Sequence, residues 1–121
     1  MTDSDTLRPE ALDRLREWGG EKLLGQMVRL FLENSGTRMD QIRTGVADSD
    51  PAEAEKGSHS LKSSAANLGA GRVQTLCAQI EDAATQNDLN TIAGLLPELE
   101  TSYAAVIAQL EAIAKGFEDE S

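Results

Sequence analysis

Apolar residues recur at alternating steps of four and three over the last part of the chain, and no other feature constrains the fold as strongly. The positions are Ile92, Leu96, Leu99, Tyr103, Val106, Leu110, Ile113 and Phe117. An α-helix turns by about 100° per residue, so these side chains share one face. The spacing predicts a long amphipathic helix. Proline cannot donate a helical hydrogen bond, so we expect a kink or a broken first turn at Pro97.

Helical spacing also governs the first half of the chain. We expect a short helix that begins at Pro9 and Glu10 and is stopped by the pair Gly19-Gly20. The next segment has an apolar face that is interrupted at residues 34–36 and then resumes. The residues of this face are Leu23, Leu24, Met27, Leu30 and Phe31 before the interruption and Met39, Ile42 and Val46 after it.

The middle of the chain contains clear signals for helix ends. Asp50 can cap a helix that starts at Pro51, and Gly69 is a natural stop after Leu68. A further helix follows, and Asn87-Asp88 marks a turn before the last one. The apolar residues of the helix before this turn are Val73, Leu76, Cys77, Ile80 and Ala84. The chain is therefore predicted to be all-α, an antiparallel four-helix bundle with a short additional N-terminal helix.

Length and cysteine content limit the organisation of the protein. A chain of 121 residues predicts one domain over 1–121, with an acidic tail at about 117–121. The start at Met1 and the acidic tail suggest a complete small protein. Cys77, the single cysteine, excludes an intramolecular disulfide. The sequence has no signal peptide and no apolar run of membrane-spanning length, so we expect a cytoplasmic protein.

The charge of the chain excludes two classes of partner. The net charge is −10 and the isoelectric point is near 4.4, so nucleic acid and anionic membranes are poor partners. The charge is also uneven. Beyond Arg72 the only basic residue is Lys115, while the part of the chain around His59 keeps several cations.

His59 is the only histidine, and helical geometry places it on the polar side of its helix. The expected core stripe consists of Ala54, Ser58, Leu61, Ala65 and Leu68, and His59 lies roughly 140° from its centre. Its helical neighbours are Glu55, Lys56, Lys62 and Ser63, with Ala66 one turn further along. An ordinary exposed histidine is one interpretation. However, two lysines favour an anion on the ring, and the small Ser63 and Ala66 would let a partner approach, which suits reversible phosphorylation.

Other chemistries have less support. One histidine and a cysteine in a core stripe cannot form a zinc site, and Gly69-Ala70-Gly71 is no phosphate-binding loop, so ATP binding is not expected. The four serines near His59 leave a Ser/His/Asp triad open, although no nucleophile elbow is visible. Leu12 and Trp18 of the first helix could form a partner surface instead of core.

The stretch from His59 to Gly69 resembles the signature of histidine-containing phosphotransfer (HPt) domains, H-x-L-K-G-S-S-x-x-L-G. The matching residues are His59, Leu61, Lys62, Ser64, Leu68 and Gly69. The resemblance implies a four-helix bundle that carries a phosphoryl group between aspartates of receiver domains, in a hybrid sensor kinase, a response regulator or both. It also implies no cofactor and no kinase activity with ATP, with Mg²⁺ bound by the partner receiver.

The resemblance also assigns roles to residues. It implies that His59 accepts the phosphoryl group on Nε2, that Lys62 offsets its charge and that Ser64 supports the site. Glu81 stands where some members have a residue that hydrogen-bonds the imidazole. Ser63 replaces the glycine that lets the receiver come close, so docking is expected to survive with altered affinity or partner choice.

Two functions of different classes follow from the sequence. The first is a phosphorelay carrier, with Glu55, Lys56, Ser63 and Ala66 forming the surface where the receiver docks. The alternative is a non-catalytic acidic helical-bundle adaptor or regulator, in which His59 is incidental. Replacing His59 by glutamine abolishes the first function and leaves the second nearly intact.

Overall fold

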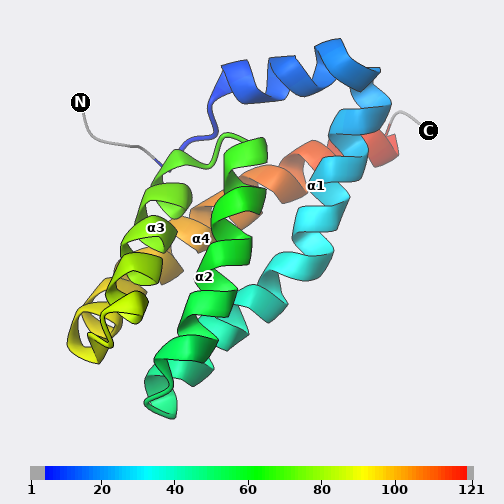
Figure 1. Ribbon diagram of the computed structural model, residues 1–121. Coiled ribbons are helices and arrows are strands. Elements are labelled where there is room, and N and C mark those ends of the chain that lie inside the picture. Colours follow the sequence, from blue (N-terminus) through cyan, green and yellow to red (C-terminus); the bar gives the residue numbers. More distant parts are fainter. Residues whose placement is uncertain (1–4, 120–121) are drawn as a thin grey trace.

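Four helices form the part of the protein that the computed structural model describes, residues 5–119. They are α1 (Pro9–Ala47), α2 (Pro51–Asn67), α3 (Gly71–Thr85) and α4 (Leu89–Asp119). Each helix packs against the next one in the sequence, and α1 also packs against α4, which closes the bundle. Figure 1 shows α2 between α1 and α3 on one face, with α4 behind them. The prediction of an all-α bundle with antiparallel neighbours is confirmed.

The ends of the helices follow the capping signals in the sequence. The Asp50 carboxylate accepts a hydrogen bond of 3.3 Å from the backbone N–H of Glu53, so it caps α2. Asp88 accepts a 3.1 Å bond from the N–H of Thr91 and caps α4 in the same way. Gly69, just after α2, has a φ of 75°, which is typical of a glycine that stops a helix.

The core lies along the facing stripes of the helices. All five residues of the stripe expected on α2 are buried, and so are the five apolar residues expected on α3. The largest fully buried side chains are Leu24, Val28, Met39, Ile42, Leu61, Leu68, Val73, Ile80, Ile92, Leu99, Val106 and Leu110. These residues come from all of the helices, and most of them lie on the faces that the periodicity predicts. Two positions in α1 differ, because Val28 is buried without having been predicted, while the predicted Leu30 is 51% exposed.

The prediction of a separate short N-terminal helix was wrong. Residues 9–20 are the first arm of α1, and the helix bends at Gly20, where φ is 69° and ψ is −167°. Only glycine adopts this conformation readily. Figure 1 shows the arm crossing the end of the bundle before α1 turns along it. Ala11 and Leu15 of the arm are buried, and the N–H of Arg8, just before the arm, donates to the carbonyl of Gly69 at 2.9 Å.

The expected interruption at residues 34–36 was also wrong. Helix α1 runs through residues 34–36 without interruption, because the buried Ser35 bonds to the Tyr103 hydroxyl of α4 at 2.8 Å. Helix α4 continues through Pro97, so the chain has no broken turn there, and the alternative of a kink at this proline stays a prediction. The expected acidic tail begins within α4. The side chains beyond Phe117 lie outside the described residues, as do positions 120–121 altogether.

Gly57 sets how closely α1 and α2 approach each other behind His59. A Cβ atom at this position would lie 2.5 Å from the carbonyl oxygen of Arg38 and 2.9 Å from the Cβ of Gln41. Real Cβ atoms do not come so close to backbone, so any larger residue would push the two helices apart.

We expect Gly57→Ala to lower the free energy of unfolding by about 1–3 kcal/mol, because overpacking outweighs the better helix propensity of alanine. The matched control is Gly94→Ala in α4, where a new Cβ would have nothing within 4 Å. That variant should gain roughly 0.5–1 kcal/mol. Urea denaturation of both variants checks this, and a gain of stability in both would contradict the proposed close packing.

Candidate functional site

Helix α2 presents His59 on its outer surface. The side chain is 65% exposed, while Leu61 and Ala65 on the opposite side of the helix are fully buried. Ser58 is buried beside them, and its hydroxyl donates to the carbonyl of Glu55 at 3.2 Å. The prediction that His59 faces away from the core is therefore confirmed.

Helix α3 contributes a carboxylate that holds the histidine ring. Glu81 Oε2 lies 2.5 Å from His59 Nδ1, and Glu81 Oε1 accepts a hydrogen bond of 2.5 Å from Lys62 Nζ. The Glu81 side chain is only 19% exposed, and Lys62 is 32% exposed. One carboxylate therefore bridges two side chains that lie almost one turn apart on α2.

The charge state of Glu81 determines which ring nitrogen is available. The hydrogen bond from Lys62 lowers the pKa of Glu81 below its ordinary value, and the contact with His59 acts in the same direction, while burial opposes both. An ionised carboxylate can only accept hydrogen bonds, so His59 Nδ1 carries the hydrogen in this contact. In a neutral imidazole the lone pair is then on Nε2, which leaves that ring nitrogen as the one with nucleophilic character.

The other residues predicted for the site lie around this cluster. Ser64 is exposed, and its hydroxyl donates to the carbonyl of Ser60 at 3.2 Å within α2. Lys56 is exposed and lies 3.7 Å from Glu53, so it pairs with its own helix. Ser63 is exposed, whereas Glu55 and Ala66 are half-buried. The structure thus brings together His59 and Lys62, and it leaves the serines outside the contact with Glu81.

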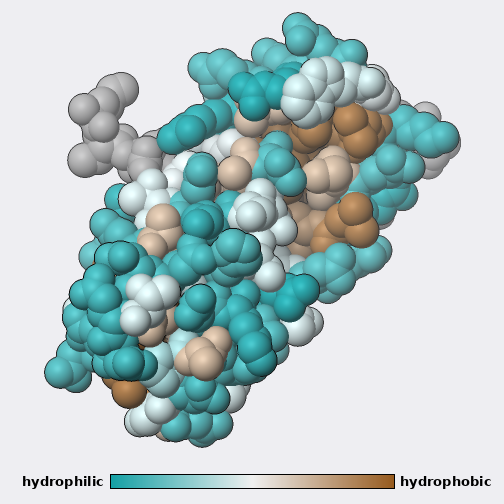
Figure 2. All heavy atoms as spheres, viewed as in Figure 1, coloured by the Kyte–Doolittle hydropathy of each residue, from teal (hydrophilic) through white to brown (hydrophobic). Residues whose placement is uncertain are grey.

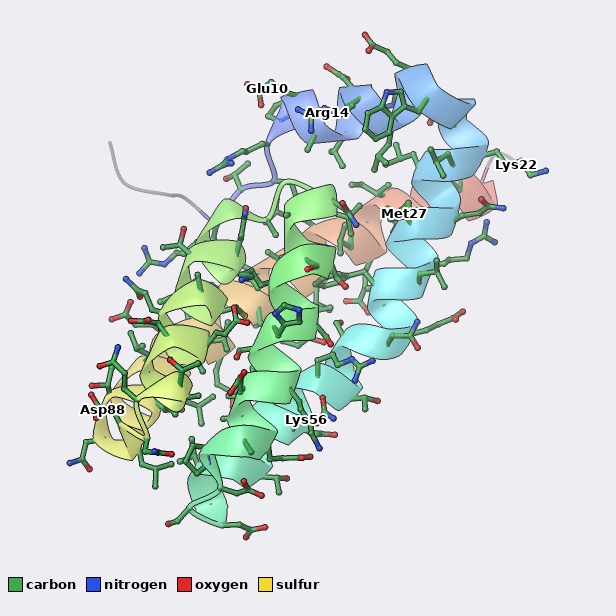
Figure 3. All side chains as sticks on the ribbon, viewed as in Figure 1. Glu10, Arg14, Lys22, Met27, Lys56 and Asp88 are labelled. Carbon is green, nitrogen blue, oxygen red and sulfur yellow. The ribbon has the colours of Figure 1, made fainter. Side chains whose placement is uncertain are left out.

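A hollow of about 300 Å³ lies between α1 and α2 beside the site. Its lining residues come from both helices and are Met27, Leu30, Phe31, Asn34, Ser35, Arg38, Ser60, Ser64 and Asn67. Figure 2 shows apolar residues gathered where the arm of α1 meets the rest of that helix, and Figure 3 shows Met27 on α1 and Lys56 on α2. Leu30 is 51% exposed and Trp18 on the arm is 72% exposed. Leu30 therefore gives the hollow between α1 and α2 an exposed apolar side chain.

The residue pattern of the sequence did not identify Glu81 as a site residue, and only the family resemblance pointed to it. The period of α3 places it next to the buried Ile80, at the edge of the apolar stripe. That position shows that Glu81 is near a helix contact, but the partner across the contact depends on how α3 is placed along α2. Cys77, one turn before it, is buried, and burial raises the pKa of its thiol to about 12. It is a core residue, as expected.

Within residues 5–119, no group of three or more histidine, cysteine, aspartate or glutamate side chains could hold a metal ion. In the same part of the chain, no helix has both the length and the apolar content needed to cross a membrane.

Comparison with protein families matches residues 26–115 to the Hpt domain. This match covers most of the chain and includes the helices that carry His59, Lys62 and Glu81. The protein belongs to the Hpt domain family, whose members are phosphotransfer domains of phosphorelays. It is thus a phosphoryl carrier.

A solved structure agrees with this assignment at the level of the fold. The crystal structure of histidine-containing phosphotransfer protein B (HptB) from Pseudomonas aeruginosa PAO1 superposes with a TM-score of 0.83 at 21% sequence identity. The match covers 90% of this chain and 94% of HptB. No curated protein sequence matches the chain.

We expect Lys62→Met to raise the pKa of Glu81 toward its ordinary value of 4.5, because Lys62 is the largest cause of the lowering. The stabilisation that comes from ionised Glu81 is present above the unfolded-state pKa and is lost as the pH falls through the lower folded-state pKa. Carboxyl ¹³C NMR during a pH titration measures the change. Lys56→Met is the control, since Lys56 pairs with Glu53. An unchanged Glu81 titration in Lys62→Met would show that the ion pair does not form in solution.

Proposed function

We propose that His59 accepts a phosphoryl group on Nε2 from the aspartyl phosphate of a receiver domain and passes it to an aspartate of a response regulator. The observation that supports this most directly is the contact between Glu81 and Nδ1. It orients an exposed ring with Nε2 as the nucleophile, which is what attack on phosphorus requires.

Little further chemistry is needed from this chain. Phosphoryl transfer proceeds through a loose transition state, so catalysis consists mainly of positioning and charge stabilisation. Here α2 and α3 position the imidazole, and the bridged Lys62 supplies a cation one turn from it. We propose that Mg²⁺ and the acidic pocket belong to the receiver. Ser64 bonds within α2, so its proposed role is to support the helix beside the site.

We propose that the receiver docks over the outer face of α2 and the adjoining part of α1. Four residues around His59 would make the nearest contacts, namely Glu55, Lys56, Ser63 and Ala66. The exposed Leu30 and the hollow between α1 and α2 would extend this surface. An apolar area with charged groups at its edge is typical of a protein interface.

The experiment that tests the proposed function is transfer from a phosphorylated receiver. Acid-labile, alkali-stable phosphate should appear on the protein, and His59→Gln should abolish it while the circular dichroism spectrum stays unchanged. His59 is an exposed side chain, so its replacement should change the free energy of unfolding by less than about 0.5 kcal/mol. Phosphate that still transfers to His59→Gln would exclude His59 as the acceptor. A protein that binds partners normally and never takes up phosphate would be an adaptor.

A second prediction concerns Ser63, which lies one turn from His59 on the exposed face. Ser63→Leu and Ser63→Arg should fold normally, because the position is in solvent, yet transfer from a receiver should be reduced at least about tenfold, the effect of losing about 1.4 kcal/mol of binding. Ser63→Gly should retain transfer and fold with a loss of roughly 0.5–1 kcal/mol.

The control for the Ser63 variants is a small phosphodonor. Phosphoramidate needs no docked protein, so it should label His59 equally well in the parent and in the bulky variants. Receiver-driven transfer that is unaffected by a bulky residue at position 63 would show that the receiver approaches from another side.

A further inference from the structure

We propose that Trp18 and Leu30, on the two sides of the bend in α1, form an apolar corner that binds the receiver domain and helps to select it. The proposal rests on the proposed function, because it takes a receiver as the partner. It places a contact on the arm of α1, residues 9–20, which lies outside the residues that match the Hpt domain, 26–115.

Trp18 belongs to the face of the arm that packs on the bundle. It follows Leu15 by three positions and Ala11 by seven, so the three side chains share one face of the helix. Ala11 and Leu15 are buried, yet Trp18 is 72% exposed. The apolar face of the arm therefore extends past the bundle, and its largest side chain is left mostly in solvent.

Apolar side chains continue on the other side of the bend. Leu23 and Met27 are partly buried against the core, and Leu30 is 51% exposed. Within the described part of the chain, Trp18 and Leu30 are the large hydrophobic side chains that are exposed. Figure 2 shows apolar residues gathered at this bend, and Figure 3 shows Met27 on α1 just after it. The apolar corner consists of these four residues.

The bend holds the corner in one shape. Gly20 has a conformation that only glycine adopts readily, and Arg16 on the arm donates to Glu21 after the bend at 2.7 Å. The chain just before the arm is tied to α4, because the N–H of Leu7 donates to the side chain of Gln109 at 2.9 Å. A surface that is already ordered loses little conformational entropy when a partner binds.

The distribution of charge indicates which partner this face accepts. Helix α1 contains six basic and six acidic residues, so the whole net charge of −10 lies outside it. Arg14 on the arm and Lys22 just after the bend are exposed (Figure 3). Arg16 pairs with Asp13 and Glu21, which offsets two carboxylates near the bend. An acidic partner therefore meets less repulsion at α1 than elsewhere on the molecule, and a receiver with an acidic pocket is such a partner.

The corner is continuous with the surface around His59. Met27 and Leu30 line the hollow between α1 and α2 together with Ser60, which directly follows His59. A protein interface of ordinary size buries about 800 Å² on each partner, so one receiver can reach both places. Tryptophan is among the residues that most often dominate the binding energy of an interface. Trp18 is therefore expected to be the main anchor of this contact.

The test is transfer to Trp18→Ala from the receiver domain that phosphorylates the wild-type protein. The receiver concentration for half-maximal transfer should rise at least about tenfold, while the rate at saturating receiver changes little. Trp18→Phe should retain most of the affinity, since an aromatic ring remains. Labelling of His59 by phosphoramidate needs no docked protein, so it should not follow the loss in Trp18→Ala.

A matched pair of leucine substitutions separates the corner from the rest of the surface. Leu30→Ala should also raise the receiver concentration that is needed. Leu95→Ala removes the same atoms from a partly buried position on α4 and should keep the wild-type value. Circular dichroism should show that all of these variants are folded.

Trp18 is the only tryptophan, so it also reports on the corner in the wild-type sequence. Protein labelled with 5-fluorotryptophan gives one fluorine NMR signal, which should shift when the receiver is added and should not depend on the concentration of the protein itself. Transfer to Trp18→Ala with the wild-type dependence on receiver concentration would overturn the inference. A signal that follows the protein's own concentration and ignores the receiver would also overturn it, because the corner would then bind a second copy. A receiver that shifts the signal and never phosphorylates His59 would instead contradict the proposed function.

Discussion

The site depends on one interaction, the Glu81 carboxylate held between His59 and Lys62. Neither α2 nor α3 alone can form it, because the acceptor and its two partners are on different helices. An exposed histidine on an isolated helix would rotate freely and exchange its proton between both nitrogens. The carboxylate fixes the orientation of the ring and its tautomer together, as a second group does for many catalytic and metal-bound histidines.

That interaction requires one particular register between α2 and α3, and the packing of the core sets this register. Leu61 and Ala65 of α2 are fully buried, as are Val73 and Ile80 of α3, so sliding either helix would expose apolar surface and open cavities. On the other side of α2, Gly57 lets the backbone of α1 come close. The outer face of α2 takes no part in this packing, and it carries the exposed His59.

Sequence periodicity predicted most of the fold and the exposed position of His59, because buried stripes and caps are local properties that repeat along the chain. It failed where a tertiary contact outweighs a local signal. Ser35 and Gly36 predicted an interruption of the first long helix, but the hydrogen bond between Ser35 and Tyr103 holds α1 against α4 at this point. Gly20 bends α1 without ending it. The role of Glu81 could not be derived from the local pattern, since its partners are 22 and 19 residues away.

The state of the His59 ring before phosphorylation tests the central claim most directly. Nitrogen-15 NMR of the imidazole, recorded at a pH where the ring is neutral, distinguishes a ring nitrogen that carries a hydrogen from one that has a lone pair. The account predicts hydrogen on Nδ1 and a lone pair on Nε2 in the wild type. A ring with hydrogen on Nε2, or an equal mixture of both tautomers as in a free histidine side chain, would contradict it.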